Sequence, residues 1–141
     1  MPTAILIDGS FFLKRYRRLV EQGGQDAPAV VADRLMNWAL AHLNYHGDKR
    51  ELYRIFFYDA PPLQKRVHWP VSQKSLDFSK TPEALFRLAL FDDLRKRRKL
   101  ALRLGELADH GGWTLKPDAQ KQLLHGNLAR DQLLDEHFSY H

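Results

Sequence analysis

The sequence predicts an α/β fold with a parallel β-sheet. Two apolar runs carry this prediction, residues 4–7 and 52–58, and each ends in an aspartate followed by a chain breaker. The segment between them has the length and pattern of helices, and a strand–helix–strand crossover makes a parallel pair. Because the C-terminal ends of parallel strands meet at one edge of the sheet, we expect Asp8 and Asp59 to emerge at the same edge.

Composition narrows the class of protein. The 141 residues suffice for one domain with a sizeable core. No apolar run approaches the ~20 residues of a membrane span and no signal pattern opens the chain, so we expect no membrane partner. The absence of cysteine excludes disulfides and thiolate metal sites and agrees with a cytoplasmic location. A net charge of +5 favours an anionic partner, most commonly nucleic acid.

The first half of the chain predicts a strand, two helices and a second strand. The run at residues 4–7 is typical of a strand buried on both faces. Gly9 permits a tight exit with positive φ, and Ser10 is expected to cap a helix over residues 11–21. Asp8 is equally open to interpretation as a turn or capping residue. Asp26 and Pro28 predict the start of a second, well-buried helix over residues 29–45.

The second half is less regular. Residues 63–80 show no clear period and predict a loop. Thr81, Pro82 and Glu83 predict a helix start, and the helical pattern continues to about residue 109, as one long helix or two. We therefore expect a single domain over residues 1–141 with a helical basic insertion at about 63–110. A strand at 113–116 and short helices at 117–125 and 127–135 complete the prediction.

The two aspartates suggest a metal site. Paired carboxylates repel each other unless a cation lies between them, and their oxygens are hard ligands suited to Mg²⁺ or Mn²⁺. Such an ion orients a water molecule and stabilises the charge that builds up in phosphodiester cleavage. Asp8 and Asp59 are therefore candidate metal ligands of a nuclease.

Two segments resemble the NYN domain family, in the LabA-like bacterial branch of the PIN-like nucleases. They are Ile-Leu-Ile-Asp-Gly-Ser-Phe-Phe at residues 5–12 and Tyr-Arg-Ile-Phe-Phe-Tyr-Asp-Ala-Pro-Pro at 53–62; Ala-Asp-His-Gly-Gly-Trp at 108–113 is also similar. The resemblance implies a PIN-like, Rossmann-like three-layer sandwich and a ribonuclease that uses Mg²⁺ or Mn²⁺. Asp8 and Asp59 match the first two acidic motif positions, as catalytic metal ligands. Ser10 stands where many members carry Asn and would assist catalysis.

The resemblance covers roughly the first half to two-thirds of an NYN protein. Family members continue with a Gly-Val-Asp motif and a Gly-Asp-Ser-Asp-Phe-like strand end, and neither follows Tyr140. Three interpretations are open: the chain is a fragment, it is a truncated reading frame, or its sheet is incomplete at the C-terminal side and is completed by a homodimer or a partner chain. Two alternatives stay open: a catalytically incomplete RNA-binding or protein-interaction module, and a phosphohydrolase with Asp8 as its nucleophile.

Basic and aromatic side chains are candidates for contacting single-stranded RNA. The basic candidates for phosphate contacts are Lys14, Arg15 and Arg18, and the run Arg95, Lys96, Arg97, Arg98 and Lys99. A solvated helix surface is the competing interpretation of the run. Tyr58, Trp69 and Phe78 are candidates for stacking on bases, although aromatic residues more often belong to the core.

Overall fold

The chain folds into two compact units of mixed α/β structure. A computed structural model describes residues 1–47, 49–106 and 111–141. The sheet unit comprises Met1–Leu63 with Lys80–Leu107, and the hairpin unit comprises Gln64–Ser79 with Ala108–His141. The expectation of a single NYN-type domain stays a prediction.

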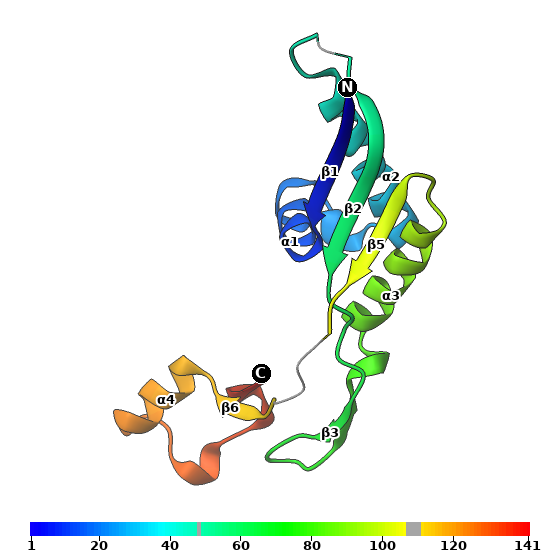
Figure 1. The fold of residues 1–141 in the computed structure, drawn as a ribbon. Coiled ribbons are helices and arrows are strands. Elements are labelled where there is room, and N and C mark those ends of the chain that lie inside the picture. The colour runs from blue at the N-terminus through cyan, green and yellow to red at the C-terminus, as the bar shows by residue number, and fades with distance from the viewer. Residues whose placement is uncertain (48, 107–110) are drawn as a thin grey trace. The chain divides into compact units, whose positions relative to one another are not determined.

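The sheet unit is built on three parallel strands. These are β1 (Pro2–Asp8), β2 (Glu51–Asp59) and β5 (Leu100–Leu104), in the spatial order β1-β2-β5. Its helices are α1 (Gly9–Leu19), α2 (Pro28–Ala41) and α3 (Pro82–Arg95), with short 3₁₀ turns at Gly23–Gln25 and His42–Gly47 (Figure 1). A further 3₁₀ turn, Phe78–Lys80, spans the boundary in sequence between the two units. This arrangement confirms the prediction of an α/β fold with a parallel sheet.

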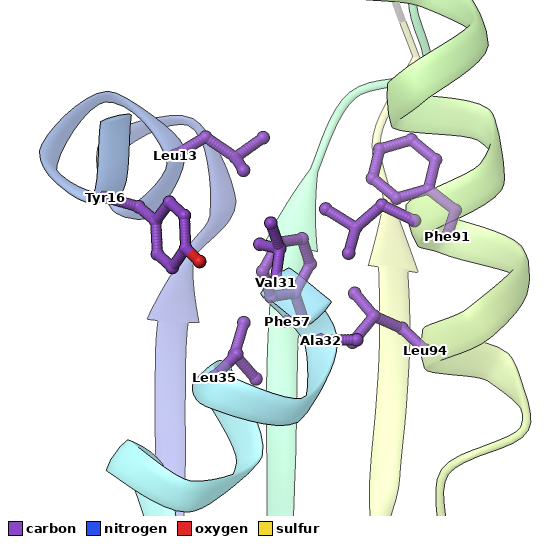
Figure 2. Packing of buried hydrophobic residues seen from close by; sticks show 9 residues of the cluster. Leu13, Tyr16, Val31, Ala32, Leu35, Phe57, Phe91 and Leu94 are labelled. Atoms are coloured by element: carbon purple, nitrogen blue, oxygen red, sulfur yellow. The ribbon is translucent and has the colours of Figure 1, made fainter. Parts of the chain in front are cut away.

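The core lies between the sheet and the helices. Ile55 and Phe57 of β2 are fully buried, and Figure 2 shows Phe57 among side chains from α1, α2 and α3. Burying a side chain of this size contributes about 1.5–3 kcal/mol. The alternate residues of the strands point to the other side, where Leu6 is 65% exposed. The expectation that β1 is buried on both faces is therefore wrong.

The start of α1 differs from the sequence prediction in two respects. Asp8, not Ser10, is the N-cap, because its carboxylate accepts a hydrogen bond from the backbone N–H of Phe11 at 3.1 Å. Gly9 is not among the glycines with positive φ. It is required for space instead: a Cβ there would lie 2.6 Å from the Phe57 ring and 2.9 Å from Oδ2 of Asp59.

The second and third helices begin at their prolines, as expected. Pro28 opens α2 and Pro82 opens α3, where the Thr81 hydroxyl accepts a hydrogen bond from the N–H of Ala84. Asp26 does not cap α2; its carboxylate accepts from the hydroxyl of buried Tyr16 at 2.5 Å. Burial and this hydrogen bond raise the pKa of Tyr16.

The predicted helical insertion at 63–110 is wrong where it crosses residues 96–104. The helix ends at Arg95, and Leu100–Leu104 forms β5 against β2. The chain reverses at Lys99, whose φ of 62° is incompatible with a continuing right-handed helix. The alternating sequence Leu-Ala-Leu-Arg-Leu then pairs as a strand because β2 offers a free edge. The predicted helical residues 107–109 lie outside the described residues.

The hairpin unit contains two antiparallel pairs. Strands β3 (Arg66–His68) and β4 (Ser75–Asp77) form one, and β6 (Trp113–Leu115) and β7 (Phe138–Tyr140) form the other. Helix α4 (Pro117–Leu124) follows β6, and 3₁₀ turns cover Arg130–Gln132 and Asp135–His137. The predicted strand at 113–116 and helix at 117–125 are confirmed, whereas 63–80 contains a hairpin rather than only a loop.

Candidate functional site

The structure places Asp8 and Asp59 at neighbouring strand ends. Asp8 pairs in register with Tyr58, the residue immediately before Asp59. Oδ2 of Asp59 also lies close to the backbone of Gly9, the residue immediately after Asp8, as the 2.9 Å approach to a Cβ built there shows. The sequence prediction that both acids emerge at one edge of the sheet is therefore confirmed.

Asp59 is a buried carboxylate with one paired and one unpaired oxygen. Its side chain is 4% exposed, and Oδ1 accepts hydrogen bonds from Nη2 of Arg87 at 2.6 Å and from the N–H of Ala60 at 2.8 Å. The same nitrogen of Arg87 donates to the carbonyl oxygen of Ala60 at 2.7 Å. Oδ2 is buried and has no hydrogen-bond partner among the described residues. A buried carboxylate oxygen left in this state favours a nearby cation.

Carboxylate oxygens are the donor type that Mg²⁺ and Mn²⁺ take. Mg²⁺ commonly uses one or two protein carboxylates and keeps several waters, and Asp8 and Asp59 place two carboxylates at neighbouring strand ends. Arg87 opposes this use, because its guanidinium already neutralises Asp59. Among the described residues, no group of three or more His, Cys, Asp or Glu side chains is arranged to hold a metal ion.

The basic candidates Lys14, Arg15 and Arg18 lie on α1, which begins immediately after Asp8. Lys14, Arg15 and Arg18 are all exposed, and the guanidinium of Arg15 lies 5.7 Å from the ring centre of Phe11. Ser10 is exposed in the first turn of α1, two residues beyond Asp8. The roles of these four residues in catalysis and RNA contact stay predictions.

The run Arg95–Lys99 lies at the opposite end of the sheet from the aspartates. It precedes β5, whereas Asp8 and Asp59 end β1 and β2, and all three strands are parallel. Five strand residues at ~3.3 Å each separate the two ends by about 16 Å. The run therefore cannot contact a phosphate held between the aspartates.

Several cations of this run are also engaged locally. Arg95 pairs with Asp92 at 2.8 Å, Arg97 pairs with Asp33 and Asp93, and Nζ of Lys99 donates to the carbonyl oxygen of Leu52. The hydrogen bonds that the guanidinium of Arg97 donates to Asp93 and Asp33 raise the pKa of Arg97. Lys96 and Arg98 are exposed in the same turn.

The three aromatic candidates have different surroundings. Trp69 packs on Trp113 with ring centres 4.7 Å apart, and Phe78 packs on Tyr140 at 5.0 Å, so both contribute to packing within the hairpin unit. Tyr58 is 45% exposed on the sheet face opposite the helices. Of the three, Tyr58 has the environment of a surface that can stack on a ligand.

Two arginines at this site were missed by sequence reasoning. Arg87 lies in the middle of α3 and carries no local signal, because its partner Asp59 is 28 residues away. Arg103 lies in β5, which was predicted to be helical, and its guanidinium lies 5.7 Å from the centre of the Phe56 ring. An alternating strand pattern at residues 100–104 was the available signal for Arg103.

An apolar groove of about 400 Å³ runs beside β1 in the sheet unit. It lies on the side of β1 away from β2, and its lining comes from β1, α1 and α2, including Ile5, Leu19 and Trp38. Asp8 is also among the residues that line this groove.

Comparison with protein-family models, curated proteins and solved structures gives no match to this chain. Within residues 1–47, 49–106 and 111–141, no helix is both long and apolar enough to cross a membrane. The Ala-Asp-His segment that contributes to the resemblance falls at residues 108–110, outside the described part of the chain.

Proposed function

We propose that this chain is a divalent-metal-dependent ribonuclease of the NYN/PIN type, with its metal held by Asp8 and Asp59. The observation that carries the proposal is the placement of Asp8 and Asp59 at adjacent parallel strand ends, with Oδ2 of Asp59 buried and, among residues 1–47, 49–106 and 111–141, without a hydrogen-bond partner. The PIN-like three-layer sandwich is part of this proposal: in the described part of the sheet unit, helices cover one face of the three strands, which supplies two of the three layers.

The residues of this chain have separate roles in that proposal. Asp8 and Asp59 bind the ion, and Arg87 fixes the orientation of the Asp59 carboxylate through Oδ1. Lys14, Arg15 and Arg18 contact the phosphate backbone near the acidic edge, and Ser10 positions water. The ion, when bound, supplies an activated water and neutralises phosphate charge.

A non-catalytic RNA-binding module is the second candidate. Two observations favour it: Arg87 already neutralises Asp59, and no three-acid cluster occurs in the described part of the sheet unit. A partner chain or second copy that pairs with the free edge of β1 would bring further acids to the groove beside Asp8. The nuclease and the module thus differ in whether this site is completed.

Cleavage of a labelled single-stranded RNA by the full chain tests the proposal. Cleavage is expected with Mn²⁺, and it should stop with EDTA or in Asp8→Asn. Asparagine caps a helix as well as aspartate does, so this variant removes the negative charge while keeping the fold. Asp92→Asn removes an exposed acid that pairs with Arg95 and should leave cleavage unchanged.

Two results would contradict the nuclease. One is a folded wild-type chain that binds RNA but leaves it intact with Mn²⁺, which would favour the binding module. The other is cleavage that persists at wild-type rate in Asp8→Asn, which would place the chemistry elsewhere or in a contaminant.

A further inference from the structure

In the described residues of the sheet unit, helices cover one face of the sheet and leave the other face uncovered. The side chains on this side alternate with the buried ones, and in Figure 1 the strands face the viewer with α2 behind them. Register places Leu6 beside Phe56 and then Ala101, and Asp8 beside Tyr58 and then Arg103. We call the surface made by Leu6, Arg54, Phe56, Tyr58 and Arg103 the open face.

Aromatic rings and arginines meet on the open face. The rings of Phe56 and Tyr58 are stacked, with centres 6.5 Å apart and planes inclined by 28°. The guanidinium of Arg103 lies 5.7 Å from the Phe56 ring centre, and Arg54 is exposed two residues before Phe56 on the same strand. Flat rings flanked by guanidinium groups are suited to bases and phosphates of a single strand.

The arginines of the open face are available to a ligand. Among the described residues, Arg17, Arg34, Arg66, Arg87, Arg95 and Arg97 are all engaged in ion pairs. Neither Arg54 nor Arg103 enters an ion pair within the described residues. A protein partner that covered the open face would bury these two unpaired charges, whereas the cores of protein interfaces are depleted of charged residues.

Charge distribution points to the same kind of ligand. The ranges that make up the sheet unit hold 16 of the 22 lysines and arginines and 11 of the 17 acidic residues, so the whole net charge of +5 falls there. The hairpin unit has equal numbers of each sign. An anionic chain is therefore attracted to the unit that exposes the aromatic rings.

From these observations we propose that the open face binds single-stranded RNA. Bases stack on Tyr58 and Phe56, and Arg54 and Arg103 contact the flanking phosphates. The strand that carries these residues ends at Asp59, and Asp8 lies beside Tyr58. RNA on the open face is therefore directed along β2 toward the two aspartates. The inference deepens the proposed function and rests on it only for the choice of RNA as ligand.

Binding of a fluorescently labelled 12-nucleotide oligouridine to the full chain in EDTA tests this. Metal-free conditions separate binding from cleavage, so failure of the nuclease proposal leaves the result interpretable. Tyr58→Leu, which keeps an apolar side chain, should weaken binding roughly 5- to 100-fold, the range found for one stacked base. Tyr53→Leu is the matched control, because Tyr53 is 61% exposed on the same strand, at its bulge and outside the paired rows of the open face.

Two double variants that remove the same charge test whether Arg54 and Arg103 contact the RNA. Arg54→Gln/Arg103→Gln should weaken binding more than Lys96→Gln/Arg98→Gln, which removes the same charge from the turn before β5. RNA should bind at least as tightly as DNA of the same sequence.

Four results would overturn the proposal: no binding by the wild type, equal losses in Tyr58→Leu and Tyr53→Leu, equal losses in the two charge pairs, or tighter binding of DNA. A stable dimer that dissociates on Tyr58→Leu would also overturn it, because a second copy would then cover the open face.

Discussion

The guanidinium of Arg87 lies 2.6 Å from one oxygen of the Asp59 carboxylate, while the other oxygen is buried and has no hydrogen-bond partner in the part of the chain that the structure describes. The pair joins α3 to the end of β2, and its two side chains are 20% and 4% exposed. A metal ion bound at Asp59 would therefore share one carboxylate with the guanidinium of Arg87. Because the ion and Arg87 would compete for this carboxylate, the effect of replacing Arg87 on metal binding tests whether Asp59 binds an ion.

Replacing Arg87 should destabilise the sheet unit and strengthen metal binding. Arg87→Met keeps much of the aliphatic packing but leaves Asp59 buried and unpaired, which costs about 3 kcal/mol of unfolding free energy. Mn²⁺ should raise the melting temperature of this variant by more than that of the wild type, because the ion replaces the lost cation.

The control for this experiment is Arg95→Met, which breaks an exposed ion pair with Asp92. It should cost less than about 1 kcal/mol and show the same response to Mn²⁺ as the wild type. Equal Mn²⁺ shifts in both variants would mean that Asp59 is not a metal ligand.

Gly9 should tolerate no side chain. In Gly9→Ala the new Cβ would meet the Phe57 ring at 2.6 Å and Oδ2 of Asp59 at 2.9 Å, so we expect a loss of about 1–3 kcal/mol from overpacking. Gly24→Ala has no atom within 4 Å of its Cβ and should change stability by no more than about 0.5 kcal/mol. Urea denaturation measures both, and similar values for the two would refute the close packing at Gly9.

Asp8 and Ser10 should contribute unequally to stability. Asp8→Ala removes the N-cap of α1 and should cost about 1 kcal/mol, whereas Asp8→Asn should cost little. Ser10→Ala should stay within about 0.5 kcal/mol, because the carboxylate of Asp8 already accepts from Phe11. Thermal unfolding of the three variants tests this order, and a larger loss for Ser10→Ala than for Asp8→Ala would contradict it.

Acid should loosen the hairpin unit through Asp135. Hydrogen bonds from the Ser72 hydroxyl and from the N–H groups of Ser72 and Val71 lower the pKa of Asp135. A lowered folded-state pKa gives stability that is present above the unfolded value of about 3.9 and lost as pH falls through the lower folded value. The wild type should therefore lose stability in this unit at and below about pH 4.

Asp135→Asn should remove part of that acid dependence and weaken the unit at neutral pH. Asp131→Asn, which removes the same charge four residues earlier, is the control. Near-ultraviolet circular dichroism of the Trp69–Trp113 pair reports on this unit. An acid transition of equal size in Asp135→Asn and the wild type would show that other groups cause it.

Local signals predicted the elements that depend on nearby residues. The sequence predicts the two strands with apolar runs, the helix starts at Pro28 and Pro82, and the position of the two aspartates. Each of these features depends on a few consecutive residues. The alternating pattern of β5 was ambiguous, since Leu100 and Leu104 also fit a helical period, and its pairing depends on the edge of β2. The reversal at Lys99 lacks the glycine that usually marks such a backbone conformation.

The candidate site likewise combines residues that local sequence predicts with residues that depend on long-range contacts. Asp8 and Asp59 could be found because each ends a recognisable strand, but the partner of Asp59 could not. Arg87 acquires its role only when α3 packs beside the end of β2, which no periodicity encodes. The open face was equally hidden, because Tyr58 and Arg103 become neighbours only through the β2–β5 register.

The hairpin unit consists of two chain segments that the ribosome synthesises at different times. The pairing of Trp69 with Trp113, and of Val71 with Asp135 64 residues later, requires closure of long loops that contain α3 and β5. All three strands of the sheet unit have been synthesised once Leu104 is added, before most of the second segment of the hairpin unit. We therefore expect the sheet unit to fold first, with Trp69 uncovered until Trp113 is available.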